Sequence, residues 1–211
     1  MDSHWFVAFE GVIGVGKTTA ARLLQSTFGT ECIFEVVEEN PFLNDFYEDQ
    51  AKYAFQTQIF FLLSRFRQMQ AAAPGILARA NLLSDYMLAK DRIFARLTLN
   101  PDELEMHSRL YPLLASGLPQ PDLVVYLYAD TDLLMQRIAN RDRPFERSMP
   151  RDYIERLHGA YEEFFKTFND APLLRIDTNA IDFVGNPSHL QELRDRIRSR
   201  LGLGSFQESL L

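Results

Sequence analysis

Cysteine is nearly absent from this chain: Cys32 is the only one among 211 residues. A disulfide within the chain and a zinc site built from several cysteines are therefore excluded, and a reducing compartment is the natural setting. Long apolar runs are also missing, and no stretch approaches the roughly 20 residues that a membrane-spanning helix needs. We therefore expect a protein of the cytoplasm with no membrane partner.

An excess of basic charge is missing as well. Lysine and arginine together number 22 and the acidic residues 29, which gives a formal net charge of −7. Binding to duplex nucleic acid requires a basic face, and docking on an anionic membrane requires the same. The composition therefore argues against both partners. A small anionic ligand stays compatible with it, because such a ligand responds to local groups and not to the total charge.

The composition that remains is that of a globular enzyme-sized domain. Apolar residues make up 46% of the chain, which is enough to fill a core. Charged residues make up 24%, which is too low a fraction for a disordered chain. No repeat, low-complexity segment or linker divides the chain. We expect one domain spanning residues 1–211.

Short apolar runs alternate with helical patterns along the whole chain. The runs expected as strands are residues 5–9, 32–37, 81–85, 123–128 and 173–176. The segments expected as helices are 18–28, 53–73, 102–115, 132–140, 151–168 and 188–201, the second of them ending at Pro74-Gly75. This alternation predicts an α/β fold in which helices flank a five-stranded parallel sheet.

A phosphate-binding loop lies between the first strand and the first helix. The segment Gly11-Val12-Ile13-Gly14-Val15-Gly16-Lys17-Thr18 matches the pattern G-x-x-x-x-G-K-[ST]. Glycines allow a tight turn whose N–H groups point inward, and the helix that follows presents its positive end to the phosphates. Lys17 is expected on the terminal phosphates and Thr18 on Mg²⁺. We predict ATP contacts from Gly11, Gly14, Val15, Gly16, Lys17, Thr18 and Thr19.

The loop does not identify the group that accepts the phosphate. A guanine-specific N-K-x-D motif is missing, and the chain is short for an ATP-driven motor. A chain of this length with the loop at its start suits a kinase of small molecules.

Several further motifs carry a resemblance to a known family. They are Glu35-Val36-Val37-Glu38-Glu39-Asn40-Pro41-Phe42-Leu43, Phe46-Tyr47-Glu48-Asp49, Phe55-Gln56-Thr57-Gln58 and Arg141-Asp142-Arg143-Pro144-Phe145-Glu146. Each is weak alone, but in this order and at these spacings the chain resembles the deoxynucleoside kinases from the phosphate loop to about Phe165. Within that family it is similar to the bacterial purine kinases, especially the deoxyguanosine kinases. The resemblance implies a kinase fold with an arginine-rich lid at about 137–151.

Two carboxylates are candidates for the chemistry at the sugar. The resemblance matches Glu35 to the carboxylate that takes the proton of the 5′-hydroxyl, and Glu35 follows the second expected strand, at the edge where ligands of open parallel sheets bind. Asp85 ends the third expected strand and is a second candidate for the base, or a partner of Mg²⁺ together with Thr18. Glu35 is our first choice as the base.

One position departs from the common family pattern. Many members carry an arginine after the acidic residue of the third strand, where it helps to bind the 5′ end, whereas this chain has Tyr86. The deoxyguanosine kinases are similar in having tyrosine here, so we expect Tyr86 at the substrate. The missing cation is then supplied by Arg92 or by a lid arginine.

Three polar residues are candidates for recognition of the base. Gln58 and Arg65 are seven residues apart on one expected helix, so two turns bring them to one face. The resemblance matches both, together with Asp91, to the residues that contact the base edge. An amide and an Arg–Asp pair suit a purine.

The sugar and the phosphates have candidates of their own. The resemblance implies that Tyr47 and Glu146 hold the 3′-hydroxyl and that Tyr47 would crowd a 2′-hydroxyl. Arg141 and Arg143 would close over the transferring phosphoryl group and stabilise its charge. For Arg137 and Arg151, in the same segment, a solvated helix face fits better.

Together these features predict an ATP- and Mg²⁺-dependent purine deoxynucleoside 5′-kinase, for deoxyguanosine first and deoxyadenosine second. The alternatives are a kinase of broader or deoxycytidine specificity, a kinase of nucleoside monophosphates, and a non-catalytic nucleotide-binding subunit. The family resemblance also implies a homodimer, or a heterodimer with a related kinase. Phe60, Phe61 and Leu62 on the long expected helix are the apolar residues that would allow it.

Overall fold

The computed structural model describes residues 4–204, and within them one parallel sheet has five strands in the order β2-β3-β1-β4-β5. The strands are β1 (Phe6–Glu10), β2 (Glu31–Ile33), β3 (Leu82–Ser84), β4 (Leu123–Tyr128) and β5 (Leu173–Asp177). The predicted α/β fold with a five-stranded parallel sheet is confirmed. Because β1 lies at the centre, the loop that follows it opens at the middle of the sheet's carboxyl edge, where ligands of such sheets bind.

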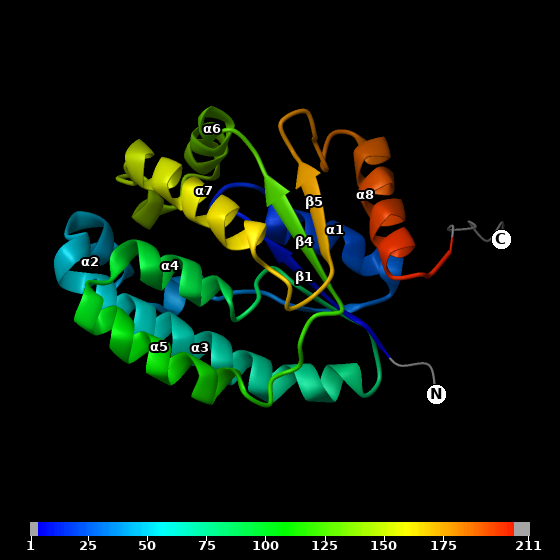
Figure 1. The fold of residues 1–211 in the computed structure, drawn as a ribbon. Helices are drawn as coiled ribbons and strands as arrows, with labels where there is room; N and C mark the ends of the chain where they lie inside the picture. Colours follow the sequence, from blue (N-terminus) through cyan, green and yellow to red (C-terminus); the bar gives the residue numbers. More distant parts are fainter. Residues whose placement is uncertain (1–3, 205–211) are drawn as a thin grey trace.

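Helices cover both faces of the sheet (Figure 1). They are α1 (Lys17–Phe28), α2 (Leu43–Glu48), α3 (Gln50–Leu77), α4 (Lys90–Thr98), α5 (Pro101–Ala115), α6 (Thr131–Arg141), α7 (Arg151–Lys166) and α8 (Pro187–Arg200). Helices α1 and α8 pack together on one side, while α3, α4, α5 and α7 lie on the other. With both faces covered, every residue of β1 is buried, and so are the first five of β4.

Two helices and two boundaries differ from the sequence-based expectation. Helices α2 and α4 were not predicted, and the predicted strand over 32–37 ends at Ile33. The strand ends early because its neighbour β3 ends at Ser84, and the next N–H group that bonds in this direction, that of Glu35, donates to the Asp85 carboxylate at 2.8 Å. Beyond Ile33 the chain therefore leaves the sheet and enters a short 3₁₀ helix at Val37–Glu39.

The long helix α3 does not end at Pro74-Gly75 as predicted. It begins at Gln50, where the Asp49 side chain accepts from the Lys52 N–H at 3.2 Å, and it continues to Leu77. A proline in a helix removes one N–H donor, but the Pro74 carbonyl still accepts from the Ala78 N–H at 3.1 Å. The helix therefore gains one more turn beyond the breakers.

No helix within residues 4–204 combines the length and the apolar character that crossing a membrane would require.

Candidate active site

The phosphate loop connects β1 to α1 in a conformation that depends on glycine. Gly11, Gly14 and Gly16 have φ angles of 144°, 86° and 105°, all in the region that disfavours other residues. A Cβ atom on Gly11 would lie 2.1 Å from the Leu127 carbonyl oxygen. The close approach of this loop to β4 therefore requires glycine at its start.

The Lys17 side chain folds back over the start of the phosphate loop and bonds two of its carbonyl groups. Its Nζ donates to the carbonyl oxygens of Gly11 at 2.6 Å and Val12 at 3.1 Å. Burial and, next to it, the charge of Lys90 lower the pKa of Lys17 to about 8. The ammonium group is thus held above the turn as a charge that an anionic ligand would stabilise.

Arg137 connects the phosphate loop to the loop that follows β5. Its guanidinium donates to the Val15 carbonyl at 3.2 Å, to the Thr178 hydroxyl and carbonyl at 3.1 and 3.0 Å, and to the Ile181 carbonyl at 3.1 Å. The expectation of a solvated helix face is therefore wrong for Arg137. It holds together two walls of a cleft lined by residues 14–19, Arg141 and residues 181–184. Arg151, by contrast, is half exposed and pairs with Asp132 and Glu155 on the surface.

A second cleft adjoins the first at Lys17 and Thr18. It is lined by Glu35, Tyr47, Arg65, Asp85, Arg141, Arg143 and Glu146, all predicted from the sequence, together with Lys90, Phe61 and Phe94 and several apolar residues. The structure thus brings together residues that are more than 100 positions apart in the chain. Gln58, Tyr86 and Asp91 do not line this cleft.

Asp85 joins the two clefts. Its Oδ2 accepts from the Thr18 hydroxyl at 2.5 Å, and its Oδ1 accepts from the Glu35 N–H at 2.8 Å. Burial raises the pKa of Asp85, against the lowering effect of its bond from Thr18. A hydroxyl and a carboxylate oxygen side by side next to the phosphate loop are ligands that suit Mg²⁺, which is usually bound by one or two protein oxygens plus phosphate.

Glu35 lies between two buried cations. Its Oε1 accepts from Arg65 Nε at 2.7 Å, and its Oε2 accepts from Lys90 Nζ at 2.6 Å. Burial alone would raise the pKa of Glu35, but Lys90 and Arg65 together lower it well below its usual range. Glu35 is therefore ionised, and its two oxygens have fixed directions.

Lys90 is the cation that the sequence analysis missed. The side chain is 7% exposed, and its charge at Glu35 takes the place of the cation that Tyr86 does not provide. Arg92, which we considered for this role, instead lies over the rings of Tyr111 and Phe164 at 5.5 and 5.9 Å. No spacing rule marks Lys90, because the residue lies on a helix that was not predicted.

Tyr86 points away from the cleft. It is fully buried, and its hydroxyl donates to the Gln68 side chain at 2.6 Å, while Gln68 donates to the Phe34 carbonyl at 2.8 Å. Tyr86 therefore does not line the cleft in which we expected it to contact the substrate. The family resemblance had placed Tyr86 at the substrate, but successive residues of an extended segment point in opposite directions, and Asp85 is the one that faces the cleft.

Arg65 and Asp91 form the expected pair behind the cleft. Arg65 is 4% exposed, and its NH1 forms an ion pair with Asp91 Oδ1. Gln58 is buried nearby on the same helix, and its Oε1 has no hydrogen-bond partner within residues 4–204. An unpartnered buried carbonyl is costly, so this amide is an acceptor in want of a donor.

The lid arginines are turned toward carboxylates of the second cleft. Arg141 donates to both oxygens of Glu146, at 3.0 and 2.5 Å, and Arg143 lies 3.4 Å from Glu38 and 3.9 Å from Glu146. Between the two arginines, Asp142 has a φ of 47°. Tyr47 lines the cleft beside Glu146. Arg141 thus lines both clefts and is held by the buried Glu146, whereas Arg143 lines only the second cleft and pairs with the exposed Glu38.

A buried carboxylate below the phosphate loop also escaped the sequence analysis. Glu10 is fully buried, and it accepts from the N–H groups of Met87 at 2.8 Å and Gly11 at 3.3 Å and from the Tyr161 hydroxyl at 3.1 Å. Burial raises the pKa of Glu10. This side chain ties the start of the loop to the segment after β3 and to α7.

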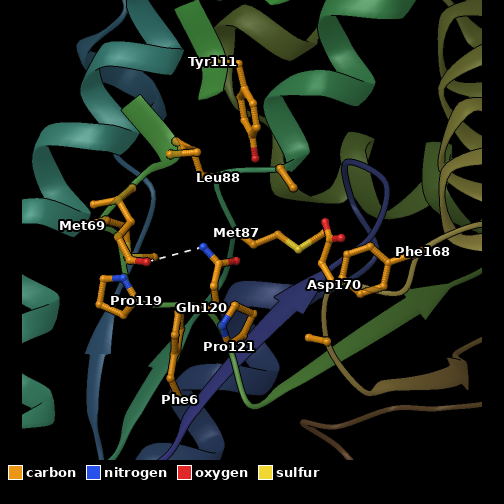
Figure 2. A pocket seen from close by; sticks show the side chains of 14 residues that line it. Phe6, Met69, Met87, Leu88, Tyr111, Pro119, Gln120, Pro121, Phe168 and Asp170 are labelled. Carbon is orange, nitrogen blue, oxygen red and sulfur yellow. Dashed lines mark hydrogen bonds between the residues drawn. The ribbon is translucent and has the colours of Figure 1, made fainter. Parts of the chain in front are cut away.

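A separate apolar cavity contains none of the predicted site residues (Figure 2). It lies among Phe6, Met69, Tyr111 and the Leu118–Pro121 segment before β4. Gln120 there donates to the Leu118 carbonyl at 3.4 Å. Its lining offers no group for phosphate chemistry apart from the carboxylate of Asp170, so the chemistry belongs to the two clefts at the carboxyl edge of the sheet.

Comparison with known proteins agrees with this geometry. The family model for deoxynucleoside kinase matches residues 7–201. The chain is 36% identical to the deoxyguanosine kinase of Bacillus subtilis (strain 168), over 94% of this chain and 98% of that one. It is 28% identical to the deoxyadenosine/deoxycytidine kinase of the same organism, over 92% of this chain and 91% of that one. Among solved structures, the deoxyadenosine kinase from M. mycoides with bound dATP superposes with a TM-score of 0.80 at 27% identity, over 92% of this chain and all of that one. The chain therefore belongs to the deoxynucleoside kinase family.

Proposed function

We propose that this kinase transfers the γ-phosphoryl group of ATP to the 5′-hydroxyl of a purine deoxynucleoside, with deoxyguanosine preferred over deoxyadenosine. The observation that carries the proposal is the hydrogen-bonded series Thr18–Asp85–Glu35, which connects the phosphate loop to the second cleft. This second cleft would hold the nucleoside and is called the acceptor cleft below. The product is the deoxynucleoside 5′-monophosphate, so the reaction serves nucleotide salvage. We assign it to the cytoplasm, where Cys32 would stay reduced.

The first cleft, beside the phosphate loop, suits a triphosphate and is called the donor cleft below. The N–H groups of the loop and the positive end of α1 face the phosphates, and Lys17 neutralises charge on them. Thr18 and Asp85 would hold Mg²⁺ between them. When bound, Mg²⁺ would supply charge stabilisation to the β- and γ-phosphates. Arg141 and Arg143 would leave Glu146 and Glu38 for the transferring group, where the negative charge is higher.

Glu35 is the better candidate for the base, and Asp85 is the alternative. Glu35 lines the acceptor cleft with an ionised carboxylate whose direction is fixed by Arg65 and Lys90. It takes the 5′-proton as the new O–P bond forms and the bond to the leaving ADP breaks. Asp85 lies against the Thr18 hydroxyl next to the phosphate loop, which suits a metal ligand more than a base.

The buried polar groups next to the cleft favour a purine. Arg65 lines the cleft as a donor that Asp91 holds in place, and Gln58 Oε1, buried on the same helix, is an acceptor without a partner within residues 4–204. Tyr47 and Glu146 would hold the 3′-hydroxyl and leave little room for a ribose 2′-hydroxyl. The relatives named above include kinases of deoxyguanosine, deoxyadenosine and deoxycytidine, so broader or deoxycytidine specificity is the alternative.

A panel of deoxynucleosides tests the proposal. Purified protein with ATP and Mg²⁺ is assayed against deoxyguanosine, deoxyadenosine, deoxycytidine and thymidine, with deoxyguanosine monophosphate included for the monophosphate-kinase alternative. The highest kcat/KM is expected for deoxyguanosine. No turnover of any deoxynucleoside would refute the proposal, and it would favour a non-catalytic nucleotide-binding subunit if ATP still bound.

A Glu35→Gln variant tests the base. We expect kcat to fall by about 10²–10⁴-fold, because general-base catalysis contributes that range, while the nucleoside still binds. The matched variant Asp85→Asn removes the metal ligand. It should instead make the rate respond to added Mg²⁺.

We also propose a homodimer, with a related kinase as the alternative partner. Phe61 and Leu62, which we had expected at the interface, are buried in the chain's own core. Large apolar side chains are exposed instead at Leu63 on α3 and at Met106, Leu110 and Leu113 on α5. Light scattering of the protein and of Leu113→Lys tests this, with a dimer expected for the first and a monomer for the second.

A further inference from the structure

We propose that His107 is a positioning residue for base selection: it holds the Asp91 carboxylate, which in turn holds the Arg65 guanidinium. The proposal rests on the proposed function, because it concerns how the acceptor cleft chooses a base. His107 itself does not line that cleft and would not touch the substrate.

The contacts run in one line from α5 to the cleft. His107 Nε2 lies 2.5 Å from Asp91 Oδ2, while Asp91 Oδ1 pairs with Arg65. Because an ionised carboxylate can only accept, the Nε2 nitrogen carries the proton of this hydrogen bond. Each oxygen of Asp91 therefore faces a donor, and the carboxylate cannot rotate without losing one of them.

Burial makes this hydrogen bond consequential. His107 is 1% exposed, Asp91 is fully buried and Arg65 is 4% exposed, so water does not replace a lost partner. Ion-pair contacts join Asp91 and Glu35, two carboxylates, to Arg65 and Lys90, two cations. These four charges balance, and the His107 ring adds an N–H donor to the second oxygen of Asp91.

His107 is itself held in place. The start of α5 has a capping box in which the Asn100 side chain accepts from the Glu103 N–H and the Glu103 side chain accepts from the Asn100 N–H. One turn after His107, the ring of Tyr111 stacks on the imidazole at 6.5 Å with 25° between the planes. The direction of Nε2 is thus set by α5, which lies outside the cleft.

Loss of the His107–Asp91 hydrogen bond would first change the position of the Arg65 guanidinium. Arg65 now divides its donors between Glu35 and Asp91, and a displaced Asp91 would leave it with Glu35 alone. The phosphate loop contacts neither His107 nor Asp91 in any hydrogen bond or ion pair of residues 4–204. The effect should therefore appear in the choice of base and not in the use of ATP.

Three variants of the full chain test the proposal. His107→Phe keeps a ring without the donor, His107→Gln keeps an N–H donor, and His158→Phe makes the same change at a half-buried histidine of α7 as the control. Steady-state kcat and KM are measured for deoxyguanosine, deoxyadenosine, deoxycytidine and ATP. For His107→Phe we expect KM for the purines to rise about tenfold or more, as the loss of one buried hydrogen bond allows. The KM for ATP should stay within about twofold of wild type, and His107→Gln should recover most of the purine preference.

Several outcomes would overturn it. A folded His107→Phe with unchanged ratios of kcat/KM among the nucleosides excludes a positioning role, and so does an equal loss for all nucleosides and ATP. If His107→Phe does not fold, His107→Gln is compared with His107→Asn, whose shorter side chain does not reach Asp91. Equal base preference in those two variants would then refute the proposal. Wild-type protein that phosphorylates no deoxynucleoside would overturn the proposed function itself, a result that the variants cannot mimic.

Discussion

Removal of the Lys90 charge should destabilise the fold, because it leaves a buried carboxylate without one of its two cations. In the wild-type chain, Glu35 and Asp91 are balanced by Arg65 and Lys90, all connected by short ion pairs. Lys90→Met keeps an unbranched apolar side chain of similar length and removes the ammonium group, with its charge and its hydrogen bond to Glu35. The group of four then carries one uncompensated negative charge.

The magnitude follows from burial and from the partner that remains. The side chains of Lys90 and Glu35 are 7% and 11% exposed, so solvent screens their pair poorly. Breaking a buried pair costs about 3–5 kcal/mol, and we expect about 3 kcal/mol because Arg65 still contacts Glu35. For a domain of this size, that loss lowers Tm by about 6–12 °C.

The assay is a double-mutant cycle in thermal or urea unfolding. The four proteins are wild type, Lys90→Met, Glu35→Gln and the double variant, which restores a balance of one cation to one carboxylate between Arg65 and Asp91. We expect the double variant to be more stable than Lys90→Met alone. A stability of Lys90→Met equal to wild type, or strict additivity of the two changes, would show that the Lys90 charge does not stabilise the ionised Glu35.

The pH dependence supplies an independent check on the same pair. Burial opposes ionisation of Glu35, but Lys90 and Arg65 outweigh it and hold its pKa below the value of about 4.3 in an unfolded chain. Its contribution to stability is therefore present above about pH 4.3 and is lost as the pH falls toward the folded pKa. The difference in stability between wild type and Lys90→Met should be largest near neutral pH and should shrink below about pH 4.

Three further predictions follow from single positions. Burial, as the largest cause, lowers the pKa of Lys17 to about 8, so the unfolded chain binds more protons than the folded chain between pH 8 and about 10.4. The contribution of Lys17 to the free energy of unfolding should therefore rise with pH over that range. Calorimetry above pH 8 should detect proton uptake when ATP binds, because the phosphates stabilise the ammonium form of Lys17. Gly11→Ala would place a Cβ atom 2.1 Å from the Leu127 carbonyl, so little folded protein should be recovered, and normal yield with normal ATP binding would contradict the close approach. Gly159→Ala, in the middle of α7 with nothing within 4 Å of the new Cβ, should raise stability by about 0.5–1 kcal/mol in urea unfolding, and a loss would show that the space is not open.

The features that could be predicted from the sequence are those that depend on residues close together in the chain. The phosphate loop depends on glycines and a lysine within eight positions, and the strands depend on short apolar runs, so both were found from spacing alone. Helix α4 was missed because its buried face carries Lys90 and Asp91, whose charges mask the apolar periodicity. The end of β2 was misplaced because it depends on where β3 ends and on the Asp85 side chain, which lies 50 positions away.

The Arg65–Asp91 pair was expected, but the other partners of the buried charges follow only from the tertiary structure. Glu35 was a good candidate from the sequence, but its partner Lys90 lies 55 positions away and Arg65 lies 30 away. Arg137, expected on a solvated surface, joins two loops across 122 and 41 positions, and Tyr86, expected at the substrate, turns into the core. A sequence motif predicts which residues lie near the edge of a parallel sheet, because the carboxyl ends of the strands meet there and each strand can be predicted from its local sequence. Which side chain faces which depends on how helices α3, α4 and α5 pack, and the free energy of that packing is shared among contacts distant in the sequence.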